Sequence, residues 1–229
     1  MLGKRKRSYN NVGEDLHRDG YVVHRKVIDV TESMQEKFLS FARMKSKTIF
    51  HHNKRRRRND YKRKQAKIKS DAEAIRDIQL FLKDTYPLHT SDECVVLHSY
   101  PGCQEQAAHC DYVPDKHLAT TDDENFPLAA LFCLMPGTTI NLWPGSHRLT
   151  YTREDILSTI DEIPKVNVKL EPGDVLIFRG DLVHGGAAYD EENVRLHTFL
   201  DSRYVPRDAN CTWLISQHAP EELDRIIQT

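Results

Sequence analysis

GDVLIFRGDLVH at residues 173–184 and HCD at residues 109–111 are the segments that decide how this sequence is interpreted. Side chains alternate between the two faces of a β-strand, so His109 and Asp111 project the same way and can bind one metal ion. His184, arriving from a distant strand, would supply a third ligand. Two imidazoles and one carboxylate on one face of an octahedron leave three positions open, which suits non-haem Fe(II). A closed structural zinc site would need a fourth protein ligand, usually a cysteine.

Two residues near these motifs are candidates for binding an organic carboxylate. Arg195 lies 11 residues after His184, so a return strand would place its guanidinium deep behind the metal. There it would form a bidentate pair with the far carboxylate of a dicarboxylate co-substrate. Tyr100 ends an apolar run at residues 94–100, and its hydroxyl is a candidate donor to the same carboxylate.

Four parts of the chain resemble the sequence pattern of one family. They are DGYVV at 19–23, SYPG at 99–102 with HCD at 109–111, WPGSHR at 143–148, and residues 173–184 with Arg195. Over most of its length the chain is similar to Fe(II)/2-oxoglutarate-dependent dioxygenases, nearest to the phytanoyl-CoA dioxygenase-like group. The resemblance implies an iron ion held by His109, Asp111 and His184. It also implies 2-oxoglutarate held by Arg195 and Tyr100.

The same resemblance implies an enzyme that uses O₂ and decarboxylates 2-oxoglutarate to succinate and CO₂. The coupled reaction would hydroxylate, or oxidatively demethylate, a C–H bond of a substrate. Related halogenases lack the carboxylate ligand, so Asp111 favours hydroxylation. A phytanoyl-CoA substrate is not implied, because a fold does not fix a function. A small molecule or a protein side chain is favoured, and a methylated base would have to be flipped into the pocket.

The predicted fold class is mainly β with flanking helices (α+β). The resemblance implies a double-stranded β-helix, the cupin-like jelly roll, and short strands punctuated by Gly and Pro agree with it. We expect a single domain over residues 1–229, with a basic helical region at about 1–90 and a β-helix core at about 91–205. Expected helices cover 31–44, a segment opening at 70–73, 152–160 and a last one from 220. Expected strands cover 94–100, 128–135, 139–143, 166–170, 174–178 and 194–201.

The charge of the chain is divided unevenly. Residues 1–70 hold 21 Lys and Arg against 7 Asp and Glu, whereas residues 71–229 hold 12 against 27. The densest stretch runs from Lys54 to Lys69, with ten basic residues opposed only by Asp60. Such a block indicates a nucleic-acid contact, a nuclear-import signal, an acidic-partner site or simply a solvated surface. An alternative function follows, in which a catalytically silent β-helix carries this block as a nucleic-acid or acidic-partner binding module.

Cysteine usage and hydropathy bear on location. The five cysteines are odd in number and lack paired metal spacing, which favours reduced thiols. No apolar run approaches the length of a membrane span, and the charged start is not followed by the apolar stretch of a signal peptide. We therefore expect an intracellular protein, cytoplasmic or nuclear, without membrane contact.

Overall fold

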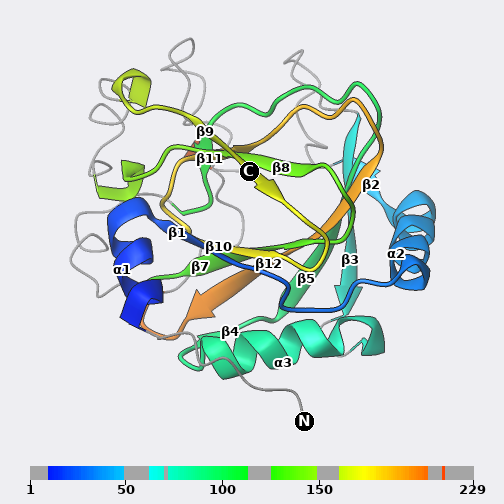
Figure 1. Cartoon of the computed structure of the whole chain (residues 1–229), viewed down its shortest axis with the longest axis horizontal. Coiled ribbons are helices and arrows are strands. Elements are labelled where there is room, and N and C mark those ends of the chain that lie inside the picture. The colour runs from blue at the N-terminus through cyan, green and yellow to red at the C-terminus, as the bar shows by residue number, and fades with distance from the viewer. Residues whose placement is uncertain are drawn as a thin grey trace.

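The computed structural model describes residues 10–48, 62–69, 72–112, 125–148, 160–205 and 213–214. Within them, two antiparallel sheets face each other as a jelly roll (Figure 1). The major sheet contains β1 (Tyr21–His24), β10 (Val175–Arg179), β7 (Leu128–Cys133), β12 (Asn193–Ser202), β5 (Glu93–Ser99), β3 (Arg63–Lys69) and β2 (Lys47–Thr48), in that order, with β4 (His89–Thr90) beside β12. The minor sheet contains β13 (Trp213–Leu214), β6 (His109–Cys110), β11 (His184–Gly186), β8 (Thr138–Leu142) and β9 (Val166–Leu170). The predicted double-stranded β-helix class is confirmed.

Alternation along the central strands separates two apolar layers. On β12, Val194 and Leu196 face the outer cluster under the helices, while Phe199 faces the interior between the sheets. On β10, Ile177 faces outward and Phe178 inward. Both faces of these strands are therefore covered, which explains why the sequence reads as nearly continuous apolar runs rather than as strict alternation. Polar side chains on the inward face stand out against this background.

Helices cover the outer face of the major sheet (Figure 1). Helix α2 (Glu32–Lys45) begins where the sequence predicts, because the Thr31 hydroxyl accepts a hydrogen bond from the Met34 N–H at 3.2 Å. Helix α3 (Arg76–Thr85) follows a short 3₁₀ turn, Glu73–Ile75, so it begins later than the expected opening at 70–73. Helix α1 (Asn10–Asp19) was not predicted. The expected helices at 152–160 and from 220 lie outside the described residues, apart from Ile160 in a 3₁₀ turn at Ile160–Glu162.

The expectation that the basic segment lies outside the β-helix core is wrong for its described half. Residues 63–69 form β3, which pairs along its whole length with β5 in the major sheet. Alternating contacts explain how a lysine-rich sequence can be a strand. Lys67 pairs with Glu93 at 2.8 Å, Lys64 lies over the Tyr100 ring, and Ala66, on the same face as Lys64, is buried. Residues 54–61 lie outside the described part of the chain.

The Gly173–Asp174 pair anchors the chain before β10. Gly173 has a φ of +92°, and a Cβ there would lie 2.4 Å from the Ile28 carbonyl oxygen, so only glycine fits. Asp174 accepts hydrogen bonds from the Glu171 and Lys26 N–H groups, each at 3.0 Å, and pairs with Arg25 at 2.5 Å. Burial alone would raise the pKa of Asp174, but these donors outweigh it and hold the pKa below its ordinary value. This part of the motif is therefore structural.

Two expectations concern thiols and membranes. Cys94, Cys103, Cys110 and Cys133 are buried, whereas Cys211 lies outside the described residues. Along the described ranges, every helix is too short or too polar to cross a membrane.

Candidate metal centre

Strand pairing in the minor sheet brings the distant motifs together. His109 of β6 is the Cα partner of His184 of β11, and their ring centroids are 4.4 Å apart. Asp111 follows β6 and projects to the same side, so that one ligand atom from each of the three residues lies within 4.8 Å of the others. All three residues are buried. The structure therefore brings together the three residues that the sequence indicated.

Backbone contacts orient both imidazoles. His109 Nδ1 is 2.8 Å from the Ala107 carbonyl oxygen, and His184 Nδ1 is 2.9 Å from the Leu182 carbonyl oxygen. A ring that donates its Nδ1–H to a carbonyl keeps the lone pair on Nε2, the atom turned toward the cluster. Burial, with the neighbouring His184 as a second cause, lowers the pKa of His109 to about 4. Burial likewise lowers the pKa of His184 to about 4, so both rings are neutral near pH 7 and able to bind a metal.

The carboxylate of Asp111 supplies an independent indication of a cation. Its Oδ2 atom is buried and has no hydrogen-bond partner among the described residues. This atom lies 3.6 Å from His184 Nε2. A buried, unsatisfied carboxylate oxygen carries the cost of lost hydration, which a divalent ion would offset. The set of two neutral imidazoles and one carboxylate therefore fits a divalent metal with open positions.

Arg195 is buried on the inward face of β12. Its Nη1 donates to Ser99 Oγ at 3.0 Å and approaches Asn193 Oδ1 at 3.4 Å. Its guanidinium carbon lies 4.9 Å from the centroid of the Tyr189 ring. The structure thus places a cation in the interior, where an aromatic ring and two neutral oxygens contact the guanidinium group.

Tyr100 is not brought into this arrangement. Its ring lies against His98, with centroids 4.2 Å apart, and Lys64 Nζ is 3.5 Å from its hydroxyl. His98 contacts Glu192 on the helix-covered side, whereas Arg195 projects from the other side of the sheet. Continued alternation after β5 explains this placement, because residues 98 and 100 share a face. Tyr189 occupies the place beside Arg195 that the sequence interpretation gave to Tyr100.

Three functional candidates were missed from sequence. Two of them, Tyr189 and Arg63, lie outside any recognised motif. Arg63 is buried and donates a hydrogen bond to the Ala187 carbonyl at 2.9 Å, and its guanidinium carbon lies 5.8 Å from the centroid of the Tyr189 ring. His197 is the third, with its Nε2 3.8 Å from Asp111 Oδ2. Burial lowers the pKa of His197 to about 4. Its position two residues after Arg195 was a usable signal, because a strand places such residues on one face.

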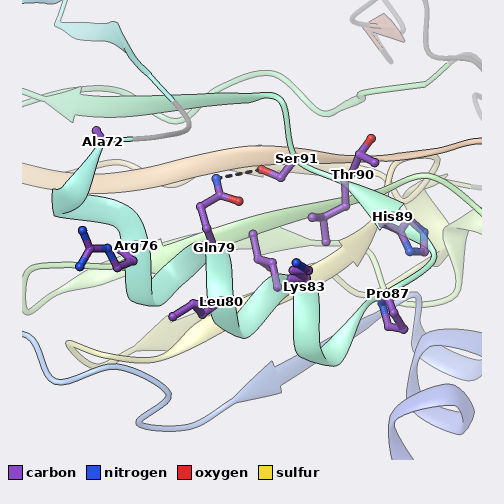
Figure 2. A pocket seen from close by; sticks show the side chains of 11 residues that line it. Ala72, Arg76, Gln79, Leu80, Lys83, Pro87, His89, Thr90 and Ser91 are labelled. Atoms are coloured by element: carbon purple, nitrogen blue, oxygen red, sulfur yellow. Dashed lines mark hydrogen bonds between the residues drawn. The ribbon is translucent and has the colours of Figure 1, made fainter.

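A separate cavity of about 490 Å³ opens on the outside of the molecule, between α3 and β4 (Figure 2). Figure 2 shows Gln79 rising from the helix toward Ser91, with Arg76 and Lys83 on the same helix. Gln79 spans the gap to the Ser91 hydroxyl at 3.4 Å. The lining of this cavity shares no residue with the metal cluster, so its size does not make it the candidate reaction site.

Sequence comparison finds a dioxygenase. The chain is 33% identical over 129 residues to Dioxygenase trt7 of Aspergillus terreus (strain NIH 2624 / FGSC A1156), a match that covers 53% of this chain and 43% of that protein. The chain thus spans less than half the length of this curated relative. No family model matches the chain.

Solved structures share the fold over most of both chains. The non-heme alpha ketoglutarate dependent epimerase SnoN from nogalamycin biosynthesis is 18% identical, with a TM-score of 0.60, covering 84% of this chain and 80% of the other. HygX from Streptomyces hygroscopicus, with nickel and 2-oxoglutarate bound, is 13% identical, with a TM-score of 0.62 and coverages of 92% and 93%. A prolyl-4-hydroxylase from Pseudomonas putida is 14% identical, with a TM-score of 0.59 and coverages of 85% and 99%. The chain therefore has the double-stranded β-helix fold of 2-oxoglutarate-dependent enzymes, while nothing in these matches points to the phytanoyl-CoA dioxygenase-like group.

Proposed function

We propose that this chain is an Fe(II)- and 2-oxoglutarate-dependent oxygenase. The observation that carries the proposal is the buried cluster of His109, Asp111 and His184, with both Nε2 lone pairs turned inward and one carboxylate oxygen unsatisfied. These three residues would hold the metal. The fold shared with enzymes described as alpha ketoglutarate dependent supports the choice of iron and 2-oxoglutarate over a structural metal.

Arg195 would anchor the co-substrate. A guanidinium pre-arranged by Ser99 and the Tyr189 ring offers a planar fork to a carboxylate, and its burial strengthens a charge-assisted pair. A five-carbon dicarboxylate has one end for the metal and one for this arginine.

A bound Fe(II) would supply the redox chemistry that couples oxidative decarboxylation of 2-oxoglutarate to oxidation of a substrate C–H bond. The protein positions the reactants and excludes water from the site. Phe178 packs against His184, with ring centroids 4.7 Å apart, and the apolar layer around it excludes water. We infer hydroxylation or oxidative demethylation as the outcome, with Asp111 occupying the position that a halide would need.

A small molecule is the proposed substrate class. SnoN, solved in complex with nogalamycin RO, and SnoK, a carbocyclase from nogalamycin biosynthesis, have the same fold as this chain and support such a substrate. A polyanionic substrate is less well supported, because Lys67 pairs with Glu93, Lys64 lies over the Tyr100 ring and Lys62 donates to the Pro101 carbonyl.

Formation of succinate tests the proposal. The purified protein, supplied with Fe(II), 2-oxoglutarate and O₂, should release succinate slowly even without substrate, and a small-molecule screen should raise this rate. His184→Ala should abolish it. Arg76→Ala, in the outer cavity, is the matched control and should leave it unchanged. A silent scaffold, the rival hypothesis, would release no succinate above the His184→Ala background under any condition.

A further inference from the structure

We infer that His197 is a positioning residue for the metal centre, whose Nε2–H holds the carboxylate of Asp111 in the orientation needed for metal binding. The inference rests on the proposed metal site and adds a residue that the three-ligand cluster does not include. It concerns a hydrogen bond to a ligand, not a further ligand.

Strand register places His197 opposite the metal ligands. On β12 it pairs with Leu131 of β7 and Val95 of β5, in the middle of the major sheet. It shares the inward face with Arg195 and points across the sandwich toward the minor sheet, where its Nε2 comes within 3.8 Å of Asp111 Oδ2. His197 of the major sheet thus approaches the carboxylate of Asp111, which follows β6 of the minor sheet.

Neighbouring aromatic rings fix the direction of the imidazole. Phe199 packs edge-on against it, with centroids 4.9 Å apart, and the centroid of Phe178 lies 6.4 Å away. Aromatic neighbours at these distances restrict the orientation of an imidazole ring. Its polar edge is therefore directed at Asp111 by packing.

The identity of the donor follows from the other histidine. His184 Nε2 is also close to Asp111 Oδ2, at 3.6 Å, but the Nδ1 of His184 faces the Leu182 carbonyl. That contact places the ring proton on Nδ1 and leaves Nε2 as an acceptor, so His184 cannot donate to the carboxylate. Among the described residues, His197 is the imidazole that can supply an N–H to this oxygen.

A donor of this kind has a defined effect. Each carboxylate oxygen has two lone pairs, so Asp111 Oδ2 can bind the metal and still accept a hydrogen bond from His197, which stops the carboxylate from rotating and raises metal affinity. The present distance of 3.8 Å is longer than a hydrogen bond. A small rotation of the Asp111 carboxylate on metal binding would shorten this distance to that of a hydrogen bond. Asp111 Oδ2 has no other hydrogen-bond partner among the described residues.

Binding of Co(II) alone to the apoprotein tests the inference without turnover. His197→Phe keeps the ring volume but removes the N–H, and should weaken Co(II) binding by about 10- to 100-fold. His197→Gln keeps an N–H of similar reach and should restore most of the affinity. His98→Phe removes a buried imidazole from the opposite face of the sheet and should bind Co(II) like the wild type.

The thermal unfolding midpoint of each apoprotein separates loss of the donor from loss of the fold. Wild-type affinity in His197→Phe, or equal weakness in folded His197→Gln and His197→Phe, would overturn the inference while leaving the metal site standing. Failure of the wild-type protein itself to bind Co(II) would overturn the proposed function, and this inference with it.

Discussion

His109 and His184 face each other as register partners on β6 and β11, although 75 positions separate them in the chain. The pairing is what turns two sequence motifs into one site. Each ring is further held by a carbonyl oxygen two residues before it, from Ala107 and Leu182. A site pre-arranged in this way needs little reorganisation to bind a metal.

Replacement of Arg195 should weaken co-substrate binding. Arg195→Lys keeps the charge but loses the planar fork, so the affinity for 2-oxoglutarate should fall by about 10- to 100-fold. Calorimetric titration of the Co(II)-loaded protein, which does not turn over, measures this directly. Unchanged affinity in Arg195→Ala would show that another cation holds the far carboxylate.

Two tyrosines should behave differently in the same titration. Tyr189→Leu removes the ring beside the Arg195 guanidinium and should lower the 2-oxoglutarate affinity by about two- to tenfold. Tyr189→Phe keeps the ring and should lower it less. Tyr100→Phe should have no effect, because its hydroxyl lies beside Lys64 on the other side of the sheet. A larger loss in Tyr100→Phe than in Tyr189→Leu would contradict the placement of both residues.

Asp174→Asn should destabilise the fold by about 1–3 kcal/mol near pH 7, because it weakens bonds to Arg25 and to two backbone N–H groups. The pKa of Asp174 is lowered from 3.8 in the folded state, so its stabilisation is full above that value and is lost as the pH falls through the folded-state pKa. Urea unfolding at several pH values should therefore show the gap between wild type and variant closing in acid. A gap that widens in acid would mean that the folded-state pKa is raised instead.

The basic block is tested separately from the metal site. If residues 54–69 bind nucleic acid through phosphates, the binding should weaken steeply with salt and show little sequence preference. Replacing Arg55, Arg56, Arg57 and Arg58 with Ser should then reduce binding in a filter or polarisation assay while succinate release continues. Loss of both would place the block at the reaction site, and absence of binding at low salt would exclude a nucleic-acid role.

The sequence was sufficient to predict that His109, Asp111 and His184 come together, because the signal for this proximity is local and periodic. The one-residue gap between His109 and Asp111 sets a common face, and the length of 173–184 fits a strand with its turn. The structure likewise places Arg195 near the start of a return strand, β12, where it is buried. These inferences needed strand geometry and the family pattern, which indicated the residues that act together.

Other features depended on pairings that no local pattern reveals. Residues 63–69 were expected outside the core because lysines suggest exposure. In the structure they form a strand that pairs with β5, and the buried guanidinium of Arg63 donates hydrogen bonds to backbone carbonyls. Tyr100 was assigned to the pocket by proximity in sequence to His109, whereas continued alternation after β5 turns it to the helix side. Tyr189 reaches Arg195 from a loop, and only the folded chain shows that contact.

Anaerobic equilibrium dialysis against Fe(II) tests the central claim most directly. The account predicts one Fe(II) bound per wild-type chain, and loss of binding in His109→Ala, Asp111→Ala and His184→Ala, each still folded by circular dichroism. Full Fe(II) occupancy in all three variants would contradict it, because the metal would then lie elsewhere and the cluster on β6 and β11 would be structural.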